Sequence, residues 1–396
     1  MAAADLTVSH PDGPGLDRPG LDVPRLDVDG LLADPAIRIV VCCGSGGVGK
    51  TTTAAALGLR AAEHHGRRTV VLTIDPARRL AQSMGLTELD NTPRQVKGID
   101  TDASGGELHA MMLDMKRTFD EVVQAHTTPQ RAAEIFANPF YQAMSSTFSG
   151  TQEYMAMEKL GQLRARDEWD LIVVDTPPSR SALDFLDAPA RLSRFLDGRM
   201  LRLLLAPARS GRSVFSLMTA SFGLFTRAVQ KVLGAQLLTD LSGFVAALDS
   251  MFGGFRHRAD ETYRILQDPQ TAFLLVAAPE RDAVREAAYF AERLVAERMP
   301  LAGLVLNRTH QAELTTVSVE AAEAAAEALD AAGGQPVTAD ALRVHARLLR
   351  QIEREVRVAA EFTGAFPAVP AVPVPAQPAD VHDVDGLRTI GAALTA

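Results

Sequence analysis

The sequence predicts an α/β fold with a mostly parallel, doubly wound sheet and a helical insertion subdomain. From Ile37 onward, apolar strand candidates alternate with helical segments, a pattern typical of a parallel sheet covered on both faces. The first of these strands leads into a glycine-rich loop at residues 44–51, and two later strands end at Asp75 and Asp175. Because ligands of such sheets bind at the carboxyl ends of the strands, these observations predict a phosphate site there.

The glycine-rich loop satisfies the pattern G-x-x-x-x-G-K-[ST] through Gly44, Gly49, Lys50 and Thr51. Its glycines let backbone N–H groups turn toward phosphates, the lysine meets their β and γ charges, and the hydroxyl binds Mg²⁺. A helix expected from Lys50 to about Glu63 directs its positive N-terminal end at the same phosphates. A chance glycine turn is the weaker explanation, so we expect a P-loop NTPase. The expected nucleotide contacts from this loop are Gly46, Gly47, Val48, Gly49, Lys50, Thr51 and Thr52.

The remaining strands follow from short apolar runs bounded by turn residues. We expect them at residues 69–74, 108–113, 170–174, 272–277 and 301–306. Residues 366–375 alternate proline with valine and alanine, which favours a final edge strand because proline cannot donate to a sheet ladder.

Composition limits the function classes that the chain can serve. With 396 residues, 47% of them hydrophobic and 22% charged, it can bury a sizeable core. A net charge of −9 argues against a broad nucleic-acid surface. The two cysteines, Cys42 and Cys43, are adjacent and suit a reduced core, so no zinc site is expected. With no secretory signal and no apolar run of membrane-spanning length, we expect a cytoplasmic protein without a transmembrane segment.

The chain divides into a tail and one large domain. Residues 1–35 are rich in Asp, Pro and Gly and are expected to be disordered, whereas residues 36–396 form the nucleotide-binding domain. Helical insertions are expected at about residues 115–165 and 190–266. The second insertion carries an apolar stripe that either packs within its own domain or accepts an apolar segment of a client protein. The stripe consists of Leu237, Leu241, Phe244, Leu248, Met251 and Phe255.

The two strand-end aspartates are candidates for phosphoryl-transfer chemistry. Asp175 ends a short apolar strand, the usual setting of a carboxylate in the outer shell of Mg²⁺. Asp75 opens the segment Asp-Pro-Ala-Arg-Arg-Leu, where a carboxylate can orient or deprotonate the attacking water. For both residues, the competing explanation is an aspartate that caps the following helix.

These motifs resemble a known family in their order and spacing. The chain reads Gly-x-Gly-Gly-Val-Gly-Lys-Thr-Thr, then Asp-Pro-Ala, Asp-Thr-x-Pro, Pro-Glu and a strand ending in Asn. Over about residues 36–396 it is similar to the ArsA-type anion-pump ATPases and the tail-anchored-protein targeting ATPases. The resemblance implies a dimeric, Mg²⁺-dependent ATPase in which Asp75 and Asp175 belong to two nucleotide-sensing switches. It also implies that Asn307 reads adenine and that the loop at Pro279-Glu280 closes over the base. The guanine-reading Asn-Lys-x-Asp pattern is absent, since Arg308 follows Asn307.

Three departures limit what the resemblance implies. The arsenite-binding cysteines are missing, which argues against a metalloid pump subunit. The zinc-binding cysteine pair of the eukaryotic targeting dimer is missing too, so any dimer is held by other surfaces. Ser45 stands where the family's loop carries a lysine that is expected to reach the partner's phosphates. Serine cannot supply that charge.

The leading hypothesis is therefore an ATP-driven dimeric switch, with Lys50 and Asp75 as catalytic residues, that couples its nucleotide state to a hydrophobic client or a partner subunit. Because Ser45 lacks the charge, we expect slow hydrolysis alone and faster turnover beside a related subunit that carries the lysine. The alternative is a weakly active or regulatory half of such a heterodimer rather than a homodimer. A partition or division-site ATPase is less favoured, because the C-terminus is neither long nor basic.

Overall fold

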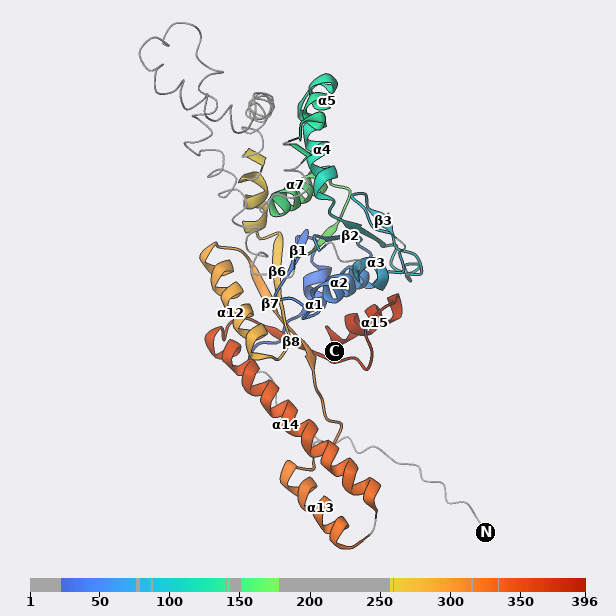
Figure 1. Cartoon of the computed structure of the whole chain (residues 1–396), viewed down its shortest axis with the longest axis vertical. Coiled ribbons are helices and arrows are strands. Elements are labelled where there is room, and N and C mark those ends of the chain that lie inside the picture. Colours follow the sequence, from blue (N-terminus) through green and yellow to red (C-terminus); the bar gives the residue numbers. More distant parts are fainter. Residues whose placement is uncertain are drawn as a thin grey trace, which may run out of the picture.

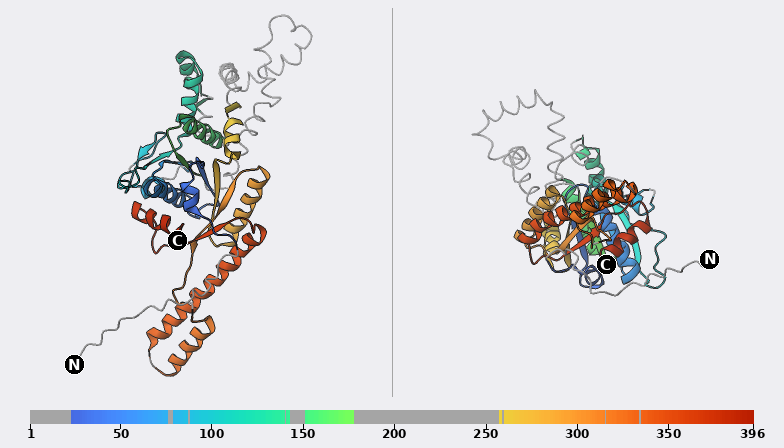
Figure 2. Two further views of the ribbon diagram at one scale, coloured as in Figure 1. Left: turned by 180° about the vertical axis from the view of Figure 1, so that it is seen from behind. Right: turned by 90° about the horizontal axis from the view of Figure 1, so that it is seen from below.

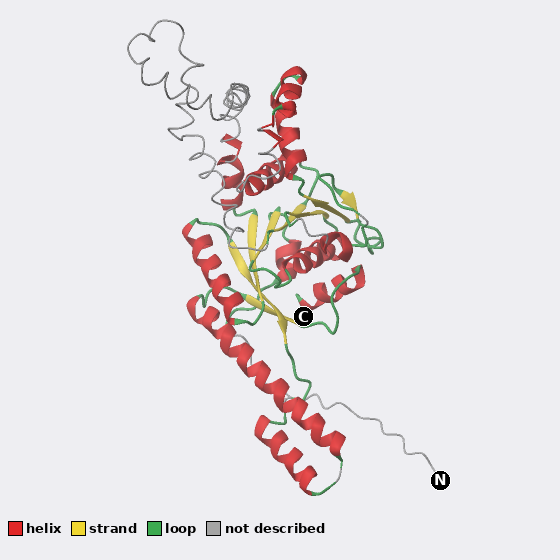
Figure 3. Cartoon of the chain, viewed as in Figure 1, coloured by secondary structure: helices red, strands yellow, loops and turns green. Residues whose placement is uncertain are grey.

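The computed structural model describes residues 23–75, 79–86, 88–139, 141–142, 151–177, 257–258, 260–314, 316–333 and 335–396. Its centre is an eight-stranded sheet with the order β3-β4-β2-β5-β1-β6-β7-β8, shown in yellow in Figure 3. Every pairing in it is parallel except that of β3 with β4. The strands are β1 (Ile39–Cys43), β2 (Arg68–Thr73), β3 (Arg94–Gln95), β4 (Glu107–Met112), β5 (Leu171–Asp175), β6 (Thr271–Ala277), β7 (Leu301–Thr309) and β8 (Ala371–Pro375). The predicted α/β class with a mostly parallel sheet is confirmed.

Helices cover both faces of this sheet, as Figure 1 shows. Successive residues of a strand point to opposite faces, so Val41 packs into one apolar core and Val40 and Cys42 pack into the other. The core containing Val41 is shared with α7 (Thr151–Arg166) and α12 (Arg281–Ala296). The second core is shared with α1 (Val28–Ala33), α2 (Lys50–His65), α3 (Arg79–Ser83) and α15 (Val384–Ala393).

The central strands are apolar runs because both of their faces are covered. All residues of β1, β5 and β6 are buried, which explains why they read as continuous apolar segments rather than alternating ones. At the outer edge, β8 pairs with β7 in parallel, and its first residue forms an isolated bridge to Arg25. The prolines of β8 therefore stand at an edge, as predicted.

The tail boundary expected at residue 35 was wrong, because the described fold begins at residue 23. Leu26 and Leu32 are buried, and Asp27 caps α1 by accepting a hydrogen bond from the Gly30 N–H at 2.8 Å. Asp29 accepts hydrogen bonds from Arg60 Nε and Nη2 at 2.8 and 2.7 Å, which ties α1 to α2. These contacts hold the pKa of Asp29 down to about 2, with the Arg60 hydrogen bond as the largest cause. Aspartates that suggest a solvated tail thus serve here as a helix cap and as an ion-pair partner. The leucines on either side of them, Leu26 and Leu32, are part of the core. Residues 1–22 lie outside the described part of the chain.

The first expected insertion is mainly helical in its described residues. It contains α4 (Met115–His126), α5 (Pro129–Ala137) and α7; α4 follows β4, and α4 and α5 project from one end of the molecule (Figure 1). Of the second insertion, the structure describes residues 257–258 and 260–266, which are helical. The apolar stripe from Leu237 to Phe255 lies outside the described residues.

A helical hairpin that the sequence analysis did not anticipate extends from the other end of the molecule. It consists of α13 (Val319–Ala331) and α14 (Pro336–Ala365), and Figure 2 shows from behind how it leads away from the sheet. A small cluster of Val319, Ala322 and Ala346 joins the two helices. Leu342, Ala346 and Leu349 follow steps of four and three, a periodicity that could have predicted α14.

Candidate nucleotide-binding site

The glycine-rich loop lies between β1 and α2, at the carboxyl edge of the sheet, and two of its glycines have no room for a side chain. Gly44 has φ of 152°, and a Cβ there would lie 2.0 Å from the carbonyl oxygen of Val276. Gly49 has φ of 96°, and its Cβ would lie 2.2 Å from Nδ2 of Asn307. The loop therefore needs glycine at both positions, for backbone angle and for space.

Lys50 begins α2 and lies back across the loop. Its Nζ donates a hydrogen bond to the carbonyl oxygen of Ser45 at 2.7 Å, and the side chain is largely buried. Burial lowers the pKa of Lys50, and the charge of Asp175 opposes this shift. The ammonium group thus lies against the backbone of the loop at Ser45.

Asp175 ends β5 and is fully buried next to the start of α2. Its Oδ2 accepts hydrogen bonds from Thr51 Oγ1 at 2.7 Å and from Thr73 Oγ1 at 2.8 Å. Its Oδ1 is buried, and no hydrogen-bond partner for it occurs among the described residues. Burial raises the pKa of Asp175 to about 6, while the two hydroxyl hydrogen bonds act in the opposite direction. A buried carboxylate oxygen without a hydrogen-bond partner is uncommon in folded proteins.

Asp75 follows β2, the strand next to β5. The two strands are in register at Thr73 and Asp175, so the predicted pair of aspartates meets at one edge of the sheet. The Asp75 N–H donates to Thr73 Oγ1 at 3.2 Å, and the carboxylate is close enough to oppose ionisation of Asp175. The residues that follow Asp75, at 76–78, lie outside the described part of the chain.

Asn307 connects the end of β7 to the loop. Its Nδ2 donates to the carbonyl oxygen of Val48 at 2.8 Å, and the side chain is buried. Pro279 stands between the end of β6 and the start of α12, half-buried, and Thr52 is half-buried in the first turn of α2. The fold thus gathers the predicted residues around one end of the sheet, although their roles stay predictions.

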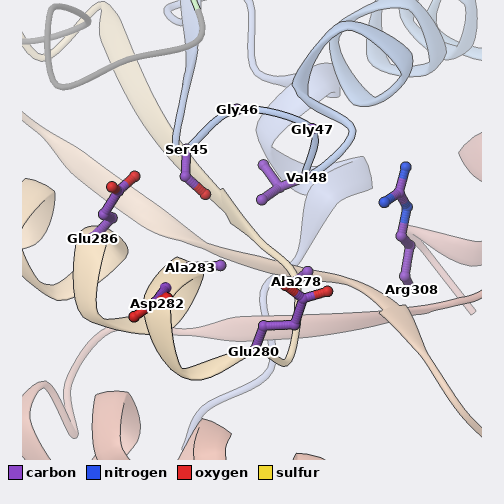
Figure 4. A pocket seen from close by; sticks show the side chains of 10 residues that line it. All are labelled: Ser45, Gly46, Gly47, Val48, Ala278, Glu280, Asp282, Ala283, Glu286 and Arg308. Atoms are coloured by element: carbon purple, nitrogen blue, oxygen red, sulfur yellow. The ribbon is translucent and has the colours of Figure 1, made fainter.

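A cavity of about 340 Å³ opens beside the loop. It is lined by Ser45, Gly46, Gly47, Val48, Ala278, Glu280, Asp282, Ala283, Glu286 and Arg308 (Figure 4). No role was expected from the sequence for Asp282, Glu286 or Arg308. Asp282 and Glu286 lie in the first turns of α12. They are four residues apart and follow the end of a strand, and this pattern could have indicated that both face the same site.

The cysteines of β1 fit the predicted core role. Both are free and buried, and burial raises the pKa of the Cys43 thiol to about 12. Thiols held protonated in this way are poor nucleophiles and poor metal ligands. In the described residues, no three His, Cys, Asp or Glu side chains gather as a metal cluster. None of the described helices is long and apolar enough to cross a membrane.

A phosphate loop between the first strand and helix, with an aspartate at the end of the adjacent parallel strand, defines a P-loop nucleotide-binding protein. Comparison with protein families identifies the group within this class. Residues 37–327 match the sequence model of the anion-transporting ATPases of the ArsA type. The chain belongs to this family, and the resemblance found in its motifs is confirmed.

Three relatives illustrate the range of the family. The chain is 27% identical over 166 residues to the ATPase GET3 of Malassezia globosa, covering 42% of this chain and 46% of the relative. It is 24% identical over 287 residues to the ATPase ASNA1 homolog 2 of Paramecium tetraurelia, covering 70% and 78%. It is 29% identical over 164 residues to a putative arsenical pump-driving ATPase of Prosthecochloris vibrioformis, covering 40% and 37%. The matches to the first and third relatives thus span less than half of each.

Proposed function

We propose that the protein is an ATP-binding and ATP-hydrolysing switch that works as a dimer. The observation that most strongly supports nucleotide binding and hydrolysis is the carboxylate of Asp175, which is fully buried against the hydroxyls of Thr51 and Thr73. Burying a charge is costly, and a binding role for that charge accounts for the cost.

The residues around the loop fit a bound triphosphate and Mg²⁺. The ammonium of Lys50 and the loop N–H groups would hold the phosphates, with Thr52 as a further contact. The hydroxyl of Thr51 and the carboxylate of Asp175 are oxygen donors of the kind that Mg²⁺ prefers, and Oδ1 of Asp175 is unused among the described residues. When bound, the ion would neutralise charge on the β- and γ-phosphate oxygens. We assign Asp75 the role of orienting the attacking water and accepting its proton.

Asn307 supplies a reason to prefer adenine over guanine. Its Nδ2 donates to the carbonyl oxygen of Val48, and no hydrogen bond to its acceptor Oδ1 occurs among the described residues. An acceptor pairs with the exocyclic amino group of adenine and is repelled by the carbonyl oxygen of guanine. Pro279, after β6, would lie over the base.

Ser45 determines how we expect the dimer to behave. Its short neutral side chain lines the cavity beside the phosphate loop and brings no positive charge to a partner's phosphates. We therefore propose slow hydrolysis by the protein alone and faster hydrolysis beside a related subunit that carries lysine there. The second candidate is a regulatory half of that heterodimer, which would bind ATP and contribute little turnover. We also propose a hydrophobic protein client. This part of the proposal depends on the sequence alone, through the apolar stripe at residues 237–255.

Nucleotide binding and phosphate release by the purified chain test the proposal. With Mg²⁺, the protein should bind ATP more tightly than GTP and release phosphate slowly. Lys50→Ala should lose both properties, whereas Lys116→Ala, which removes an exposed lysine of α4, should retain them. Binding of ATP without hydrolysis, even beside the lysine-carrying subunit, would favour the regulatory alternative. Equal binding by wild type and Lys50→Ala would refute the assignment of the site.

A further inference from the structure

Arg308 is an extra residue inserted at the end of β7. The register between β7 and β8 shifts between Asn307 and Thr309, so Arg308 forms a β-bulge, and its φ is 64°. A residue other than glycine rarely adopts this left-handed conformation, because its Cβ crowds the backbone. Bulges beside active sites redirect a side chain out of the regular alternation of the strand. The conformation therefore suggests that Arg308 has a functional role.

Contacts on both sides of Arg308 hold it in this conformation. On one side, Asn307 donates to the Val48 carbonyl at 2.8 Å. On the other, the His310 N–H donates to Oε2 of Glu355 at 2.8 Å, and the His310 ring lies 2.6 Å from Oε1. Glu355 is buried on α14, whereas the His310 side chain is 44% exposed, so these hydrogen bonds are partly shielded from water. A strained residue between two fixed neighbours is typical of functional sites.

The side chain of Arg308 extends along the cavity beside the phosphate loop. Figure 4 shows it across from Ser45 and Glu286, with Val48 between. Among the described residues, no carboxylate or carbonyl pairs with its guanidinium group. The residue is exposed, so this charge is available to a ligand that enters the cavity.

The lining of the cavity indicates which part of a nucleotide Arg308 would contact. Glu280, Asp282 and Glu286 are acidic, so a phosphate is disfavoured in the cavity itself, whereas ribose hydroxyls can donate to carboxylates. The lining also includes the apolar side chains of Val48 and Ala278. Apolar side chains beside a planar guanidinium suit the face of an aromatic ring.

We infer that Arg308 is a base-binding residue whose guanidinium stacks against the adenine of the bound nucleotide. This inference deepens the proposed ATP site, since it adds a contact with the base to the amide of Asn307. It also gives the bulge at the end of β7 a function, which is to turn this one side chain toward the nucleotide.

Binding measurements with and without the base test the inference. Titration calorimetry in Mg²⁺ would compare ATP, ADP and inorganic tripolyphosphate on wild type, Arg308→Ala and Arg308→Gly. Both variants should weaken ATP and ADP by about 2- to 30-fold and leave tripolyphosphate binding unchanged. Arg308→Gly should melt no lower than wild type, because glycine removes the backbone strain. Arg357→Ala, an exposed arginine on α14, serves as the matched control and should bind all three ligands normally.

The other outcomes separate the inference from the proposed function. Wild-type affinity for ATP in Arg308→Ala would overturn the inference and leave the proposed function standing. A parallel loss of tripolyphosphate would mean that Arg308 contacts phosphate, which also overturns stacking on the base. If wild type binds tripolyphosphate but no ATP, the inference and the proposed function both fail.

Discussion

Thr51 donates its hydroxyl hydrogen to Oδ2 of Asp175 at 2.7 Å, although 124 positions separate the two residues in the chain. The contact joins the first turn of α2 to the end of β5, and Thr73 from β2 completes it at 2.8 Å. Three elements thus meet on one carboxylate. A change in the charge or the hydrogen bonds of Asp175 can therefore affect both the start of α2 and the end of β2.

Replacing this carboxylate by an amide should abolish hydrolysis and spare the fold. Asp175→Asn removes the charge proposed to hold Mg²⁺, so phosphate release should fall by about 100-fold or more. The amide oxygen can still accept from the two threonine hydroxyls, and circular dichroism should be unchanged. Hydrolysis within a few-fold of wild type would contradict the proposed metal role.

The same carboxylate should make stability depend on pH. Its pKa in the folded chain is about 6, above the ordinary value of 3.8, so the stability contribution is complete below pH 4 and is lost as the pH rises through 6. The difference corresponds to about 3 kcal/mol. About half of this loss, ~1.4 kcal/mol, falls between pH 5 and pH 7.5, so urea unfolding in EDTA at these two pH values should show that part in wild type, and Asp175→Asn should lack it. Parallel pH profiles of the two proteins would refute the burial effect.

Introducing a lysine at position 45 should raise the rate of ATP hydrolysis in the absence of a related partner subunit. Ser45→Lys would supply a cation to the phosphates of a second copy, and the rate of phosphate release should rise by about tenfold or more. Ser45→Met, of similar length and without charge, is the control and should stay slow. An equal rate in both variants would mean that charge at this position does not limit the reaction.

Two loop glycines allow backbone strain to be separated from steric conflict. Gly49→Ala would place a Cβ 2.2 Å from Nδ2 of Asn307, whereas at Gly47, with φ of 77°, a Cβ meets nothing within 4 Å. Both substitutions carry the backbone cost of about 1–2 kcal/mol. Urea unfolding should show a larger loss for Gly49→Ala, and the difference measures the displacement of Asn307. Equal losses would mean that Asn307 moves aside at little cost.

The start of the fold at residue 23 can be tested at two neighbouring leucines. Leu32 is fully buried, so Leu32→Ala should lower the free energy of unfolding by about 2–5 kcal/mol. Leu31 is only partly buried in the same core, and Leu31→Ala should cost less. If α1 belonged to a solvated tail, chemical denaturation would show no loss for either variant.

Much of the fold could be predicted because its evidence is local. The central strands, the start of α2 at Lys50 and the edge position of β8 each follow from apolar runs, loop chemistry or proline within about ten residues. The tail boundary could not be located in this way. Asp29 is ordered by an ion pair with Arg60, which is distant in the sequence, so local sequence alone suggests a solvated residue. The hairpin of α13 and α14 carries no functional motif, and its alanine-rich pattern received no assignment.

The amino-acid sequence by itself determined the phosphate loop, the two strand-end aspartates and the family, because these depend on residue type and spacing along the chain. Tertiary structure alone decided which groups share a site. The strand order puts β5 between β2 and β1, and this brings Asp175 to Thr51 and Thr73. Arg308, at the bulge in β7, comes to line the same cavity as residues of the phosphate loop. Such contacts depend on sheet order and register, which long-range packing selects and which local spacing does not encode.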